Sequence, residues 1–157
     1  MKKISLYVLS MMLSLSIQAK EIKMESPDGT YHFTLNDENG ELRYSLNWEG
    51  KQIINPSFLG INVNGTGRDN LEIREVTTSK QDTVWHPVYG ERSEIKDCYN
   101  AWEVIVRRQN SRDKIILDVR AYDEGVAFRY RFPGGNYLKI TDEYTEYTMP
   151  EGTKAYF

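Results

Sequence analysis

Cysteine is almost absent from this sequence, since Cys98 is the one cysteine among 157 residues. A disulfide within the chain is therefore excluded, and a zinc site built on several thiolates lacks its ligands. Histidine is nearly as scarce, because His32 and His86 are the only two, so a thiol nucleophile would have few candidate bases. We expect Cys98 to be buried and chemically inert, as free cysteines often are.

An excess of positive charge is also missing. Twenty basic side chains stand against 23 acidic ones, which gives a formal net charge of −3. Nucleic-acid binding usually requires a basic surface that neutralises phosphates, so nucleic acid is not an expected partner. No segment has the periodicity of an amphipathic helix, and internal repeats and low-complexity tracts are not visible, which argues against a helical or repetitive fold.

Long hydrophobic runs are absent apart from one near the N-terminus, where two lysines precede a mainly apolar run from Ile4 to Ile17. At about 14 residues this run is shorter than the roughly 20 that a membrane-spanning helix requires. The pattern is that of a secretory signal peptide ending at the small residue Ala19. We therefore expect residues 1–19 to be removed, no membrane span, and a periplasmic or secreted product.

Aromatic residues and alternating runs are what the sequence does contain. Eleven Tyr, five Phe and three Trp supply ample material for a core,. Apolar residues at every second position, bounded by turn residues, indicate half-buried β-strands. We expect strands over residues 31–35, 42–48, 52–54, 71–76, 102–108, 114–122 and 126–132.

Turn sequences between these runs indicate antiparallel pairing. Ser26–Gly29 contains a Pro and a Gly in turn positions, and Asp123–Gly125 joins two strong strands,. Residues 20–157 are therefore predicted to form an all-β domain, an antiparallel β-sandwich of roughly ten strands. Residues 55–70 are interpreted as a loop with a short buried stretch, and residues 80–100 lack clean alternation.

The end of the sequence predicts an incomplete sheet. Ala155–Phe157 is an apolar strand start without a following turn, and such an edge promotes association. We therefore expect the chain to be the front part of a longer protein and Tyr147–Phe157 to be its adhesive element.

The irregular segment 80–100 carries residue types suited to sugars. The rings of Trp85 and Tyr89 can stack on the apolar C–H faces of a sugar, while Glu91 and Asn100 can bind its hydroxyls. Ordinary core packing of Trp85 and a surface role for His86 remain open. The arginines on polar strand faces are interpreted as partners of nearby acids; they are Arg120, Arg129 and Arg131,.

Several patches resemble a known family. Trp85–Glu91, Asp97–Asn100 and Arg120–Tyr130, preceded by Ser26–Gly29 and Pro56–Gly60, resemble in order the N-terminal domain of glycoside hydrolase family 97. The resemblance covers most of the chain after the apolar N-terminal run. It implies a β-super-sandwich like that of galactose mutarotase, followed in exported α-glucosidases and α-galactosidases by a (β/α)8 barrel and a small β-domain.

The resemblance also implies what this chain lacks. The family's catalytic carboxylates and most of its calcium-binding glutamates lie in portions without a counterpart here, so no catalytic residue, metal ligand or cofactor is assigned, and calcium is implied only for the full-length family enzyme. Glycoside hydrolysis requires two positioned carboxyl groups. The acids in Asp123–Glu124 and Asp142–Glu143 are sequence neighbours, which point to opposite faces of a strand and cannot converge on one sugar.

Three functions remain open at this point. The first is an accessory N-terminal domain of an exported α-glycosidase that breaks down α-linked oligosaccharides. The second is a stand-alone carbohydrate-binding module, and the third is a structural β-sandwich that packs on a partner. The residues expected at a substrate site or at the interface with the barrel are Trp85, His86, Tyr89, Glu91, Tyr99 and Asn100.

Overall fold

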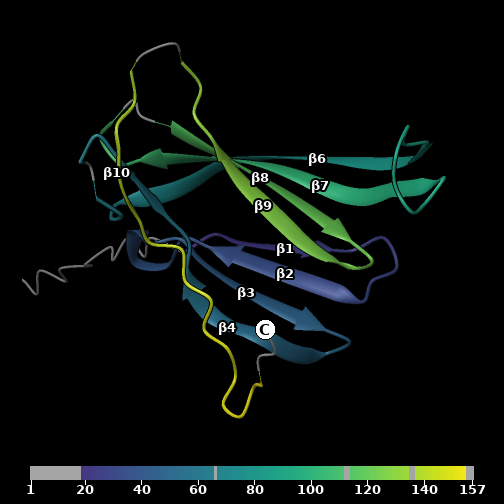
Figure 1. Ribbon diagram of the computed structural model, residues 1–157. Coiled ribbons are helices and arrows are strands. Elements are labelled where there is room, and N and C mark those ends of the chain that lie inside the picture. The colour runs from purple at the N-terminus through teal and green to yellow at the C-terminus, as the bar shows by residue number, and fades with distance from the viewer. Residues whose placement is uncertain (1–18, 66, 112–113, 135–136, 155–157) are drawn as a thin grey trace, which may run out of the picture.

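The computed structural model describes residues 19–65, 67–111, 114–134 and 137–154, and it is almost entirely β-structure (Figure 1). The predicted all-β class is confirmed. Two predictions, the signal peptide up to residue 18 and the strand start at 155–157, lie outside the described residues. Within the described ranges, no helix has the length and apolarity needed to cross a membrane.

Two antiparallel four-stranded sheets make up most of the fold, each with its strands in sequence order. The first contains β1 (Glu21–Glu25), β2 (Tyr31–Asn36), β3 (Arg43–Trp48) and β4 (Lys51–Phe58). The second contains β6 (Leu71–Trp85), β7 (Ile95–Arg108), β8 (Lys114–Tyr122) and β9 (Gly125–Arg131). A short pair joins β5 (Ile61–Val63) to β10 (Ile140–Glu143), and the 3₁₀ turn η1 (Glu38–Gly40) connects β2 to β3.

The two larger sheets lie face to face, as the predicted sandwich requires (Figure 1). Alternate residues of each strand point into the shared core because side chains switch faces at every step of a strand. Tyr44 is central, with its ring stacked on Phe33 at 5.4 Å and edge-on to Phe128 at 5.8 Å between ring centroids. The most deeply buried apolar residues are Met24, Phe33, Leu35, Tyr44, Leu59, Val104, Val106, Leu117, Val119 and Ala121.

The interpretation of residues 55–70 as a loop is wrong for residues 55–58 and 61–63, which belong to strands. β4 continues to Phe58, which pairs with Arg43, and a further strand, β5, follows. Pro56 misled the prediction because proline cannot donate to an inner ladder. It is tolerated here because β4 is the edge strand of its sheet,.

A C-terminal segment, residues 144–148, closes one side of the sandwich. Its backbone bonds to the outer edge of β4 through Asn55 N–H to the Thr148 carbonyl at 2.8 Å and Glu146 N–H to the Phe58 carbonyl at 2.9 Å. The hydroxyl of Tyr44 donates to the Glu146 carbonyl at 2.6 Å. Part of the segment predicted to be adhesive therefore covers an edge, although the side chain of Tyr147 remains half exposed.

Burial raises the pKa of Tyr44 to about 12, and the negative charges that Tyr147 and Glu146 can carry add to the shift. A raised phenol pKa means that the folded state favours the neutral hydroxyl that bonds to Glu146. This contribution to stability is present below the ordinary tyrosine pKa of about 10 and is lost as the pH rises toward 12,.

The turn between β1 and β2 is organised by Asp28. Its Oδ1 accepts hydrogen bonds from the Ser26 hydroxyl at 2.6 Å, the Thr30 N–H at 2.9 Å and the Thr30 hydroxyl at 2.8 Å. Its own N–H donates to the Asp123 carboxylate at 2.9 Å, so this turn is tied to the β8–β9 turn. The predicted turn at Ser26–Gly29 is confirmed.

These hydrogen bonds, led by the one from Ser26, lower the pKa of Asp28 to about 2. A depressed carboxyl pKa stabilises the fold above pH 3.8 and loses that effect as the pH falls toward 2,. We therefore expect Asp28→Asn to be less stable than the parent near neutral pH and to flatten the acid limb of the stability curve. Thermal melts across acidic pH test this, with Asp69→Asn as the control; an unchanged acid limb in Asp28→Asn would contradict it.

Candidate functional site

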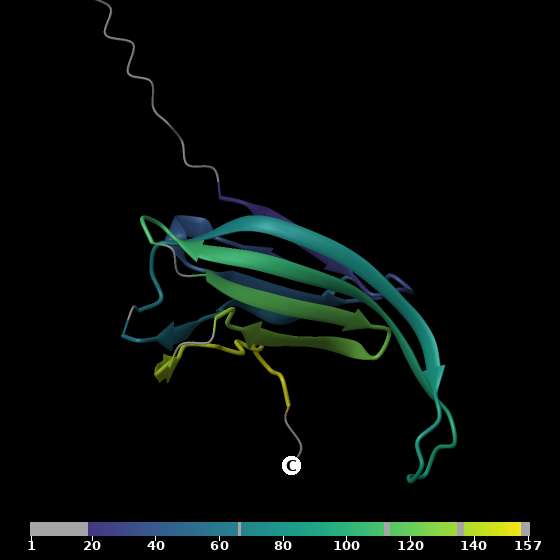
Figure 2. The same ribbon diagram turned by 90° about the horizontal axis from the view of Figure 1, so that it is seen from above.

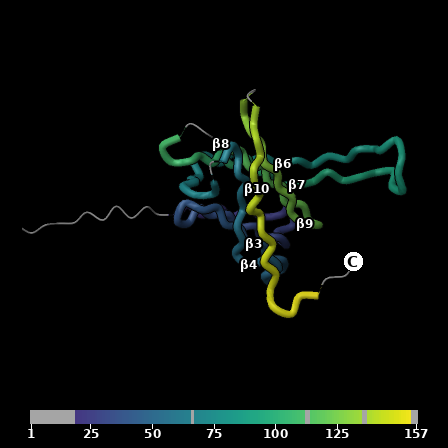
Figure 3. Tube along the Cα trace, turned by 60° about the vertical axis from the view of Figure 1, so that its left-hand side comes forward, coloured from purple at the N-terminus to yellow at the C-terminus, as the bar shows by residue number. Residues whose placement is uncertain are grey.

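The most distinctive feature of the fold is a projecting hairpin formed by the ends of β6 and β7. The alternation pattern predicted that one strand ends at residue 76 and the next begins at residue 102. In the structure, β6 runs to Trp85 and β7 begins at Ile95. The pairing of β8 with β7 stops at Asn100. Residues 81–99, here called the arm, therefore form a two-stranded ribbon that extends away from the body (Figures 2 and 3).

The missing alternation in this segment has a physical cause. Alternation marks a strand with one buried and one solvated face. Within the arm, residues 81–99, neither face of the ribbon lies over the core. Most side chains on β6 after Val76 are exposed. Both faces therefore accept polar residues, and the sequence carries no period of two there.

The tip of the arm exposes four large apolar side chains beside the charged residues Glu91, Arg92 and Glu94. Val84 and Trp85 are 50% and 51% exposed, and Val88 and Tyr89 in the connecting loop are 86% and 91% exposed. Exposed clusters of large apolar side chains mark interaction sites in soluble proteins. A two-stranded ribbon is also only marginally stable in water without a surface to pack on, so both features make the arm a candidate interaction element.

The structure brings four of the six predicted site residues to this tip: Trp85, His86, Tyr89 and Glu91. The His86 ring nitrogen Nδ1 lies 3.1 Å from the Ser93 carbonyl and 4.0 Å from a Glu94 carboxylate oxygen. These contacts hold the loop closed on itself. Glu91 is exposed in the same loop.

Tyr99 and Asn100 lie at the base of the arm instead. Tyr99 is four residues from Ile95, which pairs with Trp85, so it stands about 13 Å along the strand from the tip. The side chain of Asn100 donates to the Glu25 carbonyl of β1 at 2.8 Å, whereas the Tyr99 ring packs on Tyr122 at 5.0 Å. These adjacent residues point to opposite faces, so the predicted six-residue site is not one site.

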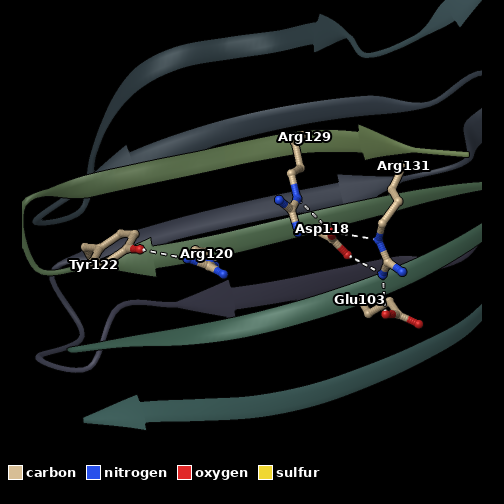
Figure 4. Close-up of polar contacts among 6 residues, drawn as sticks. All are labelled: Glu103, Asp118, Arg120, Tyr122, Arg129 and Arg131. Carbon is tan, nitrogen blue, oxygen red and sulfur yellow. Dashed lines mark hydrogen bonds and ion pairs between the residues drawn. The ribbon is translucent and has the colours of Figure 1, made fainter. Parts of the chain in front are cut away.

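The outer face of the second sheet carries a charged network beside this base (Figure 4). Asp118 accepts hydrogen bonds from Arg129 and Arg131, each with a shortest distance of 2.9 Å, and Arg131 also pairs with Glu103. The guanidinium of Arg131, assisted by that of Arg129, lowers the pKa of the Asp118 carboxyl. The interpretation as partners of nearby acids is confirmed for Arg129 and Arg131.

Arg120 belongs to the base of the arm instead. Its guanidinium carbon lies 4.5 Å from the centroid of the Tyr99 ring. Figure 4 shows its second contact, in which Nη1 lies 3.5 Å from the hydroxyl of Tyr122. The cation over the aromatic ring fixes the outer face of the arm's root, while Asn100 fixes its inner face. The arm is therefore anchored on both sides where it leaves the sheet.

Cys98 lies on the arm opposite Asp82 and is half-buried rather than buried as predicted. Partial removal from water, together with the negative charges of Asp82 and Asp123, raises the pKa of the thiol. The thiolate is the nucleophilic form of cysteine, so these surroundings favour the unreactive thiol.

Acidic side chains do not assemble into a metal centre in the described part of the chain, where no group of three or more His, Cys, Asp or Glu residues could hold an ion. Asp123 accepts a backbone hydrogen bond within the turn contact described above, and Asp142 and Glu143 are consecutive residues of β10. The predicted hairpin turn at Asp123–Gly125 is confirmed by the pairing of Tyr122 with Gly125.

One feature that the sequence did not indicate lies where β6 begins, at the opposite end of the long hairpin from the arm tip. A cavity of about 500 Å³ opens there beside Lys20, Asp37 and Gln109. Gly40 lines it in the left-handed region, with a φ of 77°, and an added Cβ would come within 3.1 Å of the Asn70 backbone. No sequence pattern near Asp37 predicts its hydrogen bonds to Lys20 and Ile73.

Comparison with known proteins gives consistent matches. Residues 24–157 match the family described as Glycosyl-hydrolase 97 N-terminal. A retaining alpha-galactosidase of Bacteroides thetaiotaomicron is 26% identical over 158 aligned positions, which cover 99% of this chain and 23% of that protein.

Solved structures give the same picture. A glycoside hydrolase family 97 enzyme from Pseudoalteromonas sp. strain K8, in complex with acarbose, matches with a TM-score of 0.76 and 28% identity over 83% of this chain and 20% of that one. A beta-arabinopyranosidase matches with a TM-score of 0.76 and 25% identity, over 83% of this chain and 21% of its own. The chain thus spans about a fifth of the length of these relatives.

Proposed function

This chain belongs to the Glycosyl-hydrolase 97 N-terminal family, and on that basis we propose that it is the accessory N-terminal β-domain of an exported α-glycosidase of the α-glucosidase or α-galactosidase type. Its partner is the catalytic (β/α)8 barrel of such an enzyme, whose substrates are α-linked oligosaccharides. The observation that carries the proposal is the exposed apolar arm tip on a domain that spans about a fifth of its relatives.

The arm supplies the contact with the catalytic barrel in this proposal. Trp85 and Tyr89 are the large aromatic side chains of the tip, and such residues dominate the binding energy of protein interfaces. The ribbon is anchored at its root by Arg120 and Asn100. An anchored ribbon with an apolar end can therefore reach a neighbouring domain while the sandwich keeps its own core.

A stand-alone carbohydrate-binding module is the second candidate. The exposed rings of Trp85 and Tyr89 favour it, because sugars stack on exposed aromatic faces,. Tyr99 and Asn100, which would have extended the sugar site, lie at the root of the arm on opposite faces. Two rings at the tip of one hairpin do not form a sugar cleft, so packing on a barrel is the stronger proposal.

The proposal includes export of the whole enzyme and the binding of calcium outside this domain. Removal of residues 1–19 would deliver the domain to the periplasm or the medium. The calcium implied for the full-length family enzyme does not fit the described residues of this chain, since none of their acidic groups forms a candidate metal centre. Any such ion would be held by the catalytic part.

We expect the 157-residue chain alone not to hydrolyse para-nitrophenyl α-glucoside or α-galactoside. The reaction requires two carboxyl groups about 5 to 10 Å apart on either side of one sugar, and Glu91 at the arm tip is a single candidate. Release of nitrophenol by the purified chain, compared with Glu91→Gln, measures this. Turnover that disappears in Glu91→Gln would overturn the proposal and make this domain catalytic.

A further inference from the structure

The backbone of Lys20, directly before β1, is held by a nearly buried carboxylate. Its N–H donates to Oδ1 of Asp37 at 2.6 Å, and the N–H of Asp37 donates back to the Lys20 carbonyl at 3.3 Å. Asp37 is only 8% exposed. Its second oxygen, Oδ2, accepts the N–H of Ile73 on β6 at 2.9 Å, so the carboxylate is fixed against both sheets.

The side chain of Lys20 adds a third attachment. Its ammonium Nζ donates to the Arg74 carbonyl on β6 at 3.3 Å. A residue at the start of an edge strand is thus bound through its amide, its carbonyl and its side chain. Chain ends are usually poorly ordered unless such contacts tie them down, and here the contacts converge on one residue.

We propose that Asp37 is a receptor for the chain's own processed N-terminus, formed when the peptide bond between Ala19 and Lys20 is cleaved. This inference rests on the export included in the proposed function. Hydrolysis by a signal-processing peptidase consumes one water, leaves a carboxylate on Ala19 and gives Lys20 an α-amine that takes up a proton. The hydrogen bond that the uncharged Lys20 amide donates to the Asp37 carboxylate then becomes an ion pair within hydrogen-bond distance.

The surroundings suit an ammonium group. Three residues with amide side chains, Asn39, Asn70 and Gln109, line the adjoining cavity of about 500 Å³. Their oxygens and water can accept the additional protons of an ammonium that the single N–H of a peptide bond does not have. The nearby carboxylate of Glu72 is paired with Arg74 at 2.7 Å, so Asp37 is the acceptor that faces Lys20.

Cleavage would therefore strengthen the fold at β1. The new ammonium adds Coulomb attraction to a hydrogen bond that the uncharged amide already makes to the Asp37 carboxylate, and this attraction is stronger at a nearly buried carboxylate than in bulk water. Since Glu21 pairs with Asn36 next to Asp37, a firmer Lys20 fixes the register of β1 against β2. The mature chain is stabilised through a contact that its precursor makes only in weaker form.

The test compares two forms of the full exported chain that differ by one residue, one starting at Lys20 and the other at Ala19. Both can donate from the Lys20 nitrogen to Asp37, but only the first places a charge there. We expect the melting temperature of the Lys20 form to be higher by about 3–6 °C. In Asp37→Asn, which keeps an acceptor of the same shape, the difference between the two forms should vanish.

A second measurement is independent of global stability. A pyridinecarboxaldehyde reagent, which condenses with N-terminal α-amines but forms no stable product with lysine ε-amines, should modify the Lys20 form about fivefold more slowly than the Ala19 form, as mass spectrometry of the N-terminal peptide would show. If Asp37→Asn does not fold, this comparison within the parent sequence still decides. Equal melting temperatures and equal reactivity would overturn the inference.

The processing step is tested separately by sequencing the N-terminus of the exported protein. A start at Lys20 supports the inference, and a start at any other residue overturns it. Neither result changes the expectation that the domain lacks hydrolytic activity or that its arm contacts a catalytic barrel. Failure of the inference is therefore distinguishable from failure of the proposed function.

Discussion

Replacing Tyr44 with alanine is expected to reduce the free energy of unfolding by about 3–5 kcal/mol, the range found for large aromatic residues in protein cores. The side chain is 2% exposed and contacts the rings of Phe33, Phe128 and Tyr147. Alanine would leave a cavity between the two sheets and release the segment at 144–148. Denaturant unfolding of the two proteins measures the difference.

Tyr44→Phe is the matched control, because it keeps the ring and removes only the hydrogen bond to the Glu146 carbonyl. We expect it to cost about 1–2 kcal/mol and to speed hydrogen exchange mainly in residues 144–148. A loss below about 1 kcal/mol in Tyr44→Ala would show that the ring does not join the sheets. Equal losses in both variants would assign the effect to the hydroxyl alone.

Replacing both Trp85 and Tyr89 with serine is expected to weaken association with a family 97 catalytic domain by about 2–4 kcal/mol. This corresponds to a Kd that is roughly 30-fold to 1,000-fold higher. The same double substitution should leave the stability of the chain itself nearly unchanged, because both side chains are at least half exposed,. Titration calorimetry between the separately purified parts measures the affinity.

Tyr137→Ser is the control for surface aromatic content. Tyr137 is 89% exposed, close to the 91% of Tyr89, but it lies in the connection between β9 and β10, away from the arm. We expect its substitution to leave the affinity unchanged. Equal weakening by Tyr137→Ser, or none by the double variant, would remove the arm from the interface. Saturable binding of a maltooligosaccharide that is lost in the double variant would favour the carbohydrate-binding module.

The sequence predicted the parts of the fold where burial is one-sided. β8 and β9 were located within a residue of their observed bounds. Val119 and Ala121 alternate with Arg120 on β8, and Phe128 and Tyr130 alternate with Arg129 and Arg131 on β9. The ends of β6 and β7 were missed for the opposite reason, since the arm has solvent on both faces. Pro56 obscured β4 because turn-forming residues are also tolerated on edge strands.

The candidate site was predictable to a similar extent. The irregular composition around Trp85 and Tyr89 coincides with the segment that projects from the body, although the sequence did not predict that projection. Tyr99 and Asn100 were grouped with it, although neighbouring residues of one strand point to opposite faces; that rule would have separated them once the strand was known to begin at Ile95. The sequence carries no pattern that singles out Asp37, because its partners Lys20 and Ile73 lie 17 and 36 residues away along the chain.

The contact between the arm tip and a catalytic barrel is the central claim, and photo-crosslinking from position 89 tests it most directly. A benzophenone side chain would replace Tyr89 in a polypeptide that carries this domain ahead of a family 97 catalytic domain, with the same probe at position 137 as the control. We predict that irradiation joins residue 89, but not residue 137, to peptides of the catalytic domain. Crosslinks from residue 89 only to peptides within residues 20–157, or to a second copy of the protein, would contradict the account.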